Sequence, residues 1–384
     1  MDVWIYDAVR TARGKARPDG GLAALKPQEL VAGLIDGLER RGADPRAADA
    51  LVLGCVGQVG AQGGNIALVT KLHSGVRDEA YAFTINNYCV SGLTAIGHTA
   101  SRIAMGGVDR ALAGGVEMMS RTPFMADAAD YYTDASFPKR SRYIPVVLSA
   151  DRLAEAEGVT REEMDATALT SQLRARAAED TPALVRSRIT VGGLVGEECL
   201  RPQMTAESLA AMPAAFGGLA KSYADALDGP IDHRHTVAHA PPVCDGAGLA
   251  LLGGKPGLGE QPRARILAYA EAGGDPHAGL LAGFTAMDKA LAQAGLDPGD
   301  MDRIEFMEAF AVTIAKFLRD RPVDPEKLNV GGGHLAKGHP MGATGAILLS
   351  SLLDALDACE GRLGLVVASA AGGIGAAMVV ERLI

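Results

Sequence analysis

The chain has 384 residues, of which 48% are hydrophobic and 4% aromatic, and its formal net charge is −9 at pH 7. This length and hydrophobic content suit one or two globular domains with a large core. The acidic balance, with no run of Lys or Arg, argues against a nucleic-acid-binding protein. No segment approaches about 18 uninterrupted apolar residues, so we expect no membrane partner.

The glycines and cysteines narrow the class further. The 48 glycines follow no collagen-like period and indicate the tight turns and close backbone approaches of an α/β protein. The five cysteines include no C-x-x-C pair, so they predict neither a disulfide framework nor a metal site. Free thiols, and an N-terminus without the basic and apolar regions of a signal peptide, favour a cytoplasmic protein.

The first part of the chain predicts strands that alternate with helices. Its apolar runs and glycine punctuation indicate strands at 3–11, 48–57, 81–89 and 108–117 and helices at 26–42 and 91–106. This order is typical of a parallel sheet with crossover helices.

The whole chain divides into three predicted segments. Residues 1–119 form an N-terminal half, and 120–245 form a loop domain that returns to it, with aromatic, charged and Pro/His-rich stretches. Residues 246–384 form a C-terminal half that repeats the glycine, helix and strand order of the first. Two such halves would direct the helices that follow Cys89 and His339 towards a common cleft.

Two motifs carry residues suited to covalent catalysis. Cys89 lies in NNYCVSG before a small-residue helix, and His339 lies in the glycine-rich stretch NVGGGHLAKGHPMGATG. Taken singly, a free cysteine is most often a buried hydrophobe and such a histidine a surface residue. Together, a helix dipole and an imidazole favour a thiolate, and free backbone N–H groups can bind an oxyanion.

Other histidines carry a weaker signal. His233, His235 and His239 are close in sequence, but no carboxylate or cysteine at ligand spacing accompanies them. We interpret this segment as a solvated loop rather than a metal site.

The two motifs belong to a longer series that resembles the thiolase family, which includes acetyl-CoA acetyltransferase and 3-ketoacyl-CoA thiolase. The similarity runs nearly end to end, through YDAVRTARGK, GGVEMMSRTPF, TREEMDATALTSQ, RPQMTAESLAAMPAAF, CDGAGLALL, EAFA and SAAGGIGAAMVVE. It implies an α/β thiolase fold with two similar βαβαβ-type halves in five αβαβα layers, and a homodimer or homotetramer. It also implies coenzyme A thioesters as substrates and no permanently bound cofactor.

The resemblance assigns roles residue by residue. It implies that Cys89 accepts the acyl group, that His339 activates it, and that the backbone N–H groups of Cys89 and Ala371 hold an oxyanion. Ser369 occupies the position of the family's second cysteine, which moves the proton on the substrate α-carbon. Because an alcohol holds its proton more tightly than a thiol, Claisen condensation should then depend on His339 or a water.

The predicted substrate pocket also departs from the family. It consists of Met307, Ala309, Phe310 and Val147, and Met307 stands where the family's NEAF motif has an asparagine beside an oxyanion. Methionine donates no hydrogen bond, so His334 or Lys337 would have to replace the amide. For Glu308 we expect a structural hydrogen-bonding role.

These departures keep three functions open. The first is a thiolase-type acyltransferase that forms an acyl-cysteine and catalyses condensation or thiolysis of 3-ketoacyl-CoA. The second is a diverged acyltransferase or thioesterase with an acceptor other than coenzyme A. The third is a thiolase-fold subunit that is non-catalytic or depends on a partner.

Overall fold

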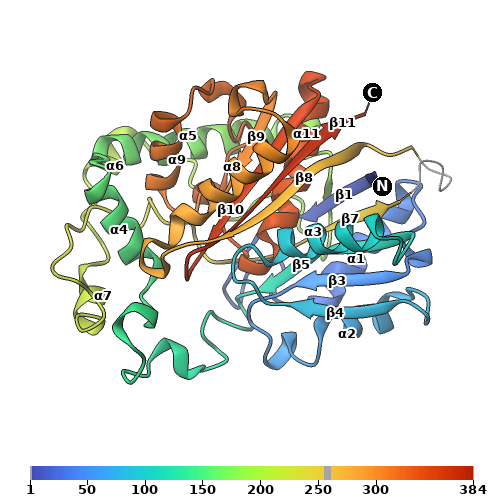
Figure 1. Ribbon diagram of the computed structural model, residues 1–384, viewed down its shortest axis with the longest axis horizontal. Helices are drawn as coiled ribbons and strands as arrows, with labels where there is room; N and C mark the ends of the chain where they lie inside the picture. The colour runs from blue at the N-terminus through green and yellow to red at the C-terminus, as the bar shows by residue number, and fades with distance from the viewer. Residues whose placement is uncertain (1, 255–260, 384) are drawn as a thin grey trace.

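The computed structural model describes residues 2–254 and 261–383. Its strands join into one 11-stranded mixed sheet, with the order β4-β3-β5-β7-β1-β8-β11-β10-β9 along its main path (Figure 1). The strands are β1 (Val3–Thr11), β2 (Gly14–Lys15), β3 (Ala50–Gly54), β4 (Tyr81–Ile85), β5 (Arg110–Met118), β6 (Arg188–Ile189), β7 (Cys244–Gly253), β8 (Ala264–Gly273), β9 (Arg303–Phe306), β10 (Leu363–Ala370) and β11 (Ile374–Arg382).

Helices cover both faces of this sheet, and a separate group forms the loop domain (Figure 1). They are α1 (Pro27–Arg40), α2 (Ile66–Ser74), α3 (Ser91–Ala104), α4 (Val146–Ala156), α5 (Arg161–Glu179), α6 (Ala206–Ala210), α7 (Gly217–Ser222), α8 (Ala282–Ala294), α9 (Ala311–Asp320), α10 (His334–Lys337) and α11 (Thr344–Cys359). Short 3-10 turns include η6 (Pro276–Leu281) and η9 (Met341–Ala343).

The strand pairing corrects the prediction of an all-parallel N-terminal unit. Strands β3, β4 and β5 are parallel as expected, but β7 lies between β5 and β1 and is antiparallel to both. All ten residues of β7 are buried, so its sequence fits any interior place in a sheet and does not reveal its neighbours. The chain therefore returns from the loop domain into the middle of the N-terminal strands.

Side chains that alternate along the strands define five layers. In β5, Leu112 points into a core shared with α1, whereas Ala111 and Ala113 point into the core around α3 and α11. In β10, Val366 joins that same central core and Val367 joins a third core under α8 and α9. Helices α3 and α11 thus lie between the two halves of the sheet, with further helices outside.

The two central helices approach closely at their N-terminal ends. A Cβ added to Gly92 of α3 would lie 2.7 Å from the carbonyl oxygen of Gly342, and one added to Gly345 of α11 would lie 2.4 Å from the Leu93 nitrogen. Helix α11 is long and apolar enough to span a membrane by composition, but 83% of that stretch is buried inside the protein. It is the core helix of the fold.

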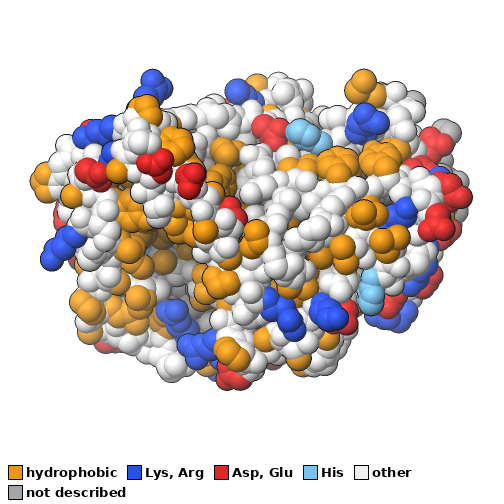
Figure 2. Space-filling view, turned by 90° about the horizontal axis from the view of Figure 1, so that it is seen from below, with side chains coloured by type: hydrophobic (Ala, Val, Ile, Leu, Met, Phe, Trp, Pro, Cys, Tyr) orange, Lys and Arg blue, Asp and Glu red, His pale blue; other side chains and the backbone are white. Residues whose placement is uncertain are grey.

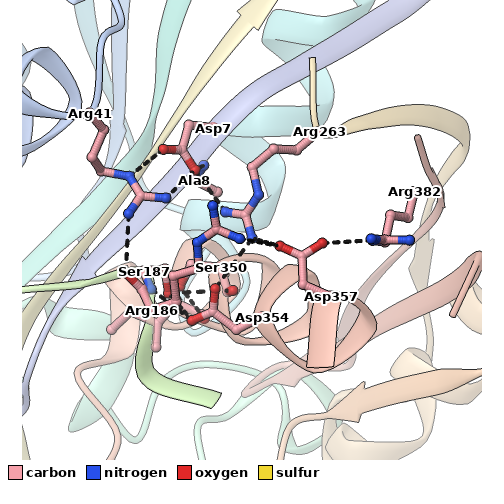
Figure 3. Close-up of polar contacts among 11 residues, drawn as sticks. Asp7, Ala8, Arg41, Arg186, Ser187, Arg263, Ser350, Asp354, Asp357 and Arg382 are labelled. Atoms are coloured by element: carbon pink, nitrogen blue, oxygen red, sulfur yellow. Dashed lines mark hydrogen bonds and ion pairs between the residues drawn. The ribbon is translucent and has the colours of Figure 1, made fainter. Parts of the chain in front are cut away.

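An ion-pair cluster ties the outer ends of the two halves together (Figure 3). Arg263 donates to Asp7 of β1 and to Asp357 of α11, each at 2.7 Å. Arg41 after α1 donates to the same Asp7 at 2.5 Å, and Arg382 of β11 donates to Asp357 at 2.6 Å. These contacts join N-terminal and C-terminal elements beside β1, β8 and β11, in the middle of the strand order.

Candidate active site

The turn before α3 sets the position of Cys89. Tyr88 has a left-handed backbone with φ of 47°, which is uncommon for a residue with a side chain. Its N–H donates to the Asn86 side chain at 3.0 Å, and its carbonyl accepts from the Ser91 hydroxyl at 2.5 Å. The strained turn is therefore held from both sides, and the half-buried Cys89 emerges where α3 begins.

The charge state of Cys89 differs from the predicted thiolate. Burial, together with the nearby Glu117 carboxylate, raises the pKa of the Cys89 thiol to about 12. The backbone N–H groups of Ala371 and of Cys89 itself act in the opposite direction and lower the pKa, but they do not outweigh burial. The resting residue is therefore a neutral thiol.

Glycines shape the turn that supplies Ala371. Gly372 and Gly373 link β10 to β11 with φ of 73° and 74°, where a side chain would be strained. A Cβ on Gly373 would also meet the Gly274 carbonyl oxygen at 2.5 Å. The turn is thereby fixed against the segment that follows β8.

His339 is held in the neutral form. The backbone N–H of His339 donates to the Pro242 carbonyl at 2.9 Å, and the ring Nδ1 lies 2.7 Å from the Thr344 hydroxyl. Burial and the charge of Arg13 lower the pKa of His339 to about 3. Its Nε2 is buried and has no hydrogen-bond partner among the described residues. When Nδ1–H donates to Thr344, Nε2 carries the free lone pair.

Glu117 connects the segments around Cys89 and His339, although the sequence analysis did not identify it. This fully buried carboxylate accepts from the backbone N–H of Val56, Gly57 and Gly342 at 2.9–3.0 Å. Val56 and Met341 belong to the small cluster on which Cys89 packs. The signal was present in the sequence, because an acidic residue at the end of a buried strand requires partners.

The structure gives Ser369 a structural hydrogen bond. Its side chain is 1% exposed, and its hydroxyl donates to the Leu280 carbonyl of η6 at 2.9 Å. Gly283 packs against the same hydroxyl, because an added Cβ there would lie 2.2 Å from it. The hydroxyl proton is therefore engaged by a backbone carbonyl.

The predicted pocket residues fall into two packed clusters. Met307 and Ala309 are buried in the central core, at 2% and 6% exposure. Val147 of α4 is buried in a loop-domain cluster, and Phe310 packs against both groups. Phe310 thus connects the catalytic core with the loop domain.

Glu308 has the hydrogen bonds expected of a structural residue. Its carboxylate accepts from the Ser171 hydroxyl at 2.7 Å, the Leu335 N–H at 2.9 Å and the Asn329 amide at 3.2 Å. These contacts fasten the segment after β9 to α5 and α10.

Among the described residues, neither His334 nor Lys337 forms a hydrogen bond with Cys89. The His334 ring packs 5.5 Å from that of His339, and burial and the nearby Arg13 keep the pKa of His334 well below its usual value. Lys337 donates to the Gly331 carbonyl at 2.9 Å, and burial lowers its pKa to about 8. The two residues form a buried layer behind His339.

The loop-domain histidines correct the prediction of a solvated loop. His235 and His239 are fully buried, and they contact the carboxylates of Asp151 and Asp165, each at 2.6 Å. His233 also contacts Asp151, at 2.8 Å. Among residues 2–254 and 261–383, no group of His, Cys, Asp and Glu has the arrangement of a metal site. These histidines instead fasten the segment before β7 to α4 and α5.

Known proteins show the same architecture. The family model of the thiolase N-terminal domain matches residues 3–253, and the family model of the thiolase C-terminal domain matches residues 260–382. The structure is similar to the crystal structure of Bacillus anthracis acetyl-CoA acetyltransferase, with a TM-score of 0.86 and 28% identity over 100% of this chain and 99% of that one.

Curated relatives agree over their full length. The steroid 3-ketoacyl-CoA thiolase FadA6 of Mycobacterium tuberculosis is 33% identical, with 100% of this chain and 94% of that protein covered. The acetyl-CoA acetyltransferase of Escherichia coli is 34% identical, with 99% and 98% covered. Together with the fold, these matches show that the chain belongs to the thiolase family and is a thiolase-type acyltransferase.

Proposed function

We propose that this enzyme forms an acyl thioester on Cys89 from an acyl-CoA or 3-ketoacyl-CoA and passes the acyl group to coenzyme A or to a second acyl-CoA. The observation that carries the proposal is the placement of Cys89 at the start of α3, where it packs in one cluster with Met341, two residues after His339, whose Nε2 is buried without a hydrogen-bond partner among the described residues. The backbone N–H groups of Cys89 and Ala371 would hold the oxyanion that forms on the substrate carbonyl oxygen during attack.

The acylation step balances with the groups present. The sulfur of Cys89 attacks the thioester carbonyl carbon, and Nε2 of His339 takes the thiol proton. With an acyl-CoA donor, the bond from carbon to the coenzyme A sulfur breaks, and the leaving thiolate takes that proton back from His339. With a 3-ketoacyl-CoA donor, the sulfur attacks the keto carbon instead, the C2–C3 bond breaks, and the leaving carbanion takes the proton to give acetyl-CoA. A neutral imidazole with a free Nε2 is the state that this transfer requires.

The second half-reaction uses the same imidazole. For condensation, a proton must leave the α-carbon of the acceptor, and the Ser369 hydroxyl is bound to the Leu280 carbonyl. We therefore assign this proton to His339 as well, with Ser369 a positioning residue for η6. Since Met307 offers no amide, condensation should be slower than acylation of Cys89.

A homo-oligomer formed along β4 completes the proposal. Strand β4 is the end of the main strand order, and it pairs with β3. Phe83 on this strand is 42% exposed, and Leu72 on the neighbouring α2 is 69% exposed. An exposed apolar edge strand favours pairing with a second copy. Phe83→Lys should lower the mass measured by sedimentation equilibrium. The free thiols support a cytoplasmic location.

Intact-mass measurement after incubation with acetyl-CoA tests the central step. The wild-type protein should gain the mass of one acetyl group, and Cys89→Ala should gain none. An unmodified wild-type protein after incubation with a range of acyl-CoAs would overturn the proposal. Addition of acetyl to both proteins would move the site to another residue.

A further inference from the structure

A chain of hydrogen bonds holds the turn that carries Cys89 and connects it to the other half of the protein. The Asn87 amide donates to the Thr94 hydroxyl of α3 at 2.9 Å, and that hydroxyl donates to Glu271 of β8 at 2.7 Å. The Asn87 amide also lies 3.4 Å from the same carboxylate oxygen. The turn before α3 is thus fastened to a strand that is far from it in the sequence.

Asn87 is also held through its backbone. Its N–H donates to the Ser91 hydroxyl at 2.8 Å, and that hydroxyl donates to the Tyr88 carbonyl at 2.5 Å. The side chain and the backbone of Asn87 are therefore both bound to the first two turns of α3. Because Tyr88 has a left-handed backbone, the turn keeps its shape only while such contacts hold it. The position of Cys89, the next residue, depends on them.

The charge of Glu271 suits it to orient this chain. Burial acts to raise the pKa of Glu271, but hydrogen bonds from His98 and Thr94 outweigh it and hold the pKa below its usual value. An ionised carboxylate only accepts hydrogen bonds, so Oε1 directs the Thr94 proton and leaves the Thr94 oxygen free to accept from Asn87. The other oxygen, Oε2, lies 3.0 Å from the exposed His98 ring. The two oxygens thus serve different neighbours.

Without Glu271, the hydroxyl of Thr94 has a competing partner in its own helix. A threonine inside a helix can donate to the carbonyl oxygen four residues earlier. For Thr94 this is the Val90 carbonyl, which already accepts the Thr94 N–H at 2.9 Å. The hydroxyl would rotate towards that oxygen, and the Asn87 amide would lose its oriented acceptor. The turn around Cys89 would then be held through its backbone alone.

The residues of this chain do not line the cavities of the loop domain. Figure 2 shows a hollow bordered by apolar side chains on the side that carries α4 and α7. Two cavities border these helices, one lined by Ser222 of α7 and the other by residues of α4. Among the described residues that line them, neither cavity includes Asn87, Thr94 or Glu271. A change at Glu271 should therefore leave these spaces as they are.

We propose that Glu271 is a positioning residue for acyl transfer, which acts through Thr94 and Asn87 to hold Cys89 where its sulfur attacks the substrate. The inference rests on the proposed acylation of Cys89. Attack requires the sulfur and the carbonyl carbon to be aligned at about 3–3.5 Å, and a misplacement of about 1 Å can lower a rate by about a hundredfold. Loss of Glu271 should therefore lower the rate of acylation and leave the binding of acyl-CoA nearly unchanged.

Stopped-flow release of coenzyme A from acetyl-CoA tests the role of Glu271. In Glu271→Ala the maximal acylation rate should fall about tenfold or more, while the acetyl-CoA concentration for half of that rate changes less than about twofold. Glu271→Gln keeps an oxygen acceptor for Thr94 and should restore most of the rate. His98→Ala, the matched control, removes only the neighbour of Oε2 and should keep the wild-type rate.

A double-mutant cycle tests the path from Glu271 to the turn. Asn87→Ala should slow acylation about as much as Glu271→Ala, and the double variant should be no slower than either, because both changes break the same chain. Losses that multiply in the double variant would refute the path. Thr94→Val removes the hydroxyl between the two residues and should show the same loss, which gives an independent test if Glu271→Ala does not fold.

The outcomes separate the inference from the proposed function. If Glu271→Ala loses stability in a denaturant titration but acylates at the wild-type rate, or if His98→Ala is equally slow, the inference is overturned while acylation itself stands. If no donor acylates wild-type Cys89, the proposed function fails, and iodoacetamide labelling of Cys89 decides the inference alone. Faster labelling in Glu271→Ala, from a loosened turn, that Glu271→Gln does not show would support it. Equal labelling rates would refute it.

Discussion

Ala371, on the turn after β10, packs in one cluster with Tyr88, the residue that precedes Cys89 before α3. The two residues come from opposite halves of the chain, so the proposed oxyanion site lies where the halves meet. Its donors are fixed by glycine geometry on one side and by the left-handed Tyr88 on the other. Such preorganised donors are commonly the largest contribution to acyl-transfer catalysis.

The alkylation of free Cys89 should rise with pH well beyond the neutral range. Because its pKa is raised to about 12, the thiolate fraction grows about tenfold for each pH unit below that value. Iodoacetamide labelling followed by peptide mass spectrometry separates Cys89 from the other half-buried thiol, Cys359. A rate that levels off near pH 7 would contradict the neutral resting thiol.

Replacement of His339 should slow acylation without unfolding the protein. His339→Ala removes the only proton acceptor assigned to Cys89, and we expect a loss of about 10²–10⁴-fold in the acylation rate. Stopped-flow release of coenzyme A measures the rate. Thr344→Val, which removes only the partner of Nδ1, should cost less. An unchanged rate in His339→Ala would assign the proton transfer elsewhere.

Ser369→Ala should affect stability more than acylation. The change leaves the Leu280 carbonyl without its donor, at a cost of about 1 kcal/mol in the free energy of unfolding. Denaturant titration measures that cost, and the rate of Cys89 acylation should stay within about twofold. A large fall in the acylation rate at unchanged stability would instead make Ser369 a member of the catalytic machinery.

Met307→Asn should restore an amide donor and raise thiolysis of acetoacetyl-CoA. One oxyanion donor is typically worth about a hundredfold or more in rate, although a buried amide without a full set of partners costs about 1–3 kcal/mol of stability. Steady-state kinetics together with a thermal melt distinguish the two effects. If the variant is folded but no faster, the Met307 side chain does not lie at the oxyanion.

Glu117 links stability to the reactivity of Cys89. Glu117→Ala leaves the buried N–H groups of Val56, Gly57 and Gly342 without acceptors and should cost about 3 kcal/mol or more. Glu117→Gln keeps an oxygen acceptor but removes the charge that raises the pKa of Cys89, so alkylation at pH 8 should become faster. Slower alkylation in the folded Glu117→Gln variant would contradict the prediction that the charge of Glu117 raises the pKa of Cys89.

The sequence predicted the parts of the candidate site that depend on local pattern. A cysteine before a small-residue helix and a histidine in a glycine-rich loop pointed to Cys89 and His339, and both precede helix starts in the structure. The prediction that Cys89 is a thiolate was wrong, because the pKa of its thiol depends on burial by segments that are distant in the sequence. The sequence also could not predict the position of β7 in the sheet, because all its residues are buried and their pattern does not indicate which strands it pairs with.

The burial of the loop-domain histidines was beyond the reach of sequence pattern for a similar reason. His235 and His239 contact carboxylates of α4 and α5, which are far from them in the chain. Only the folded loop domain brings these groups together.

The close contact of Gly92 with Gly342 and of Gly345 with Leu93 has a consequence for the folding pathway. Neither sheet half can carry the proposed site alone, because the proposed nucleophile precedes one central helix and the proposed base precedes the other. Recovery of activity during refolding should therefore lag behind recovery of helical signal and coincide with docking of the halves. Catalysis in this protein reports the completion of its tertiary structure.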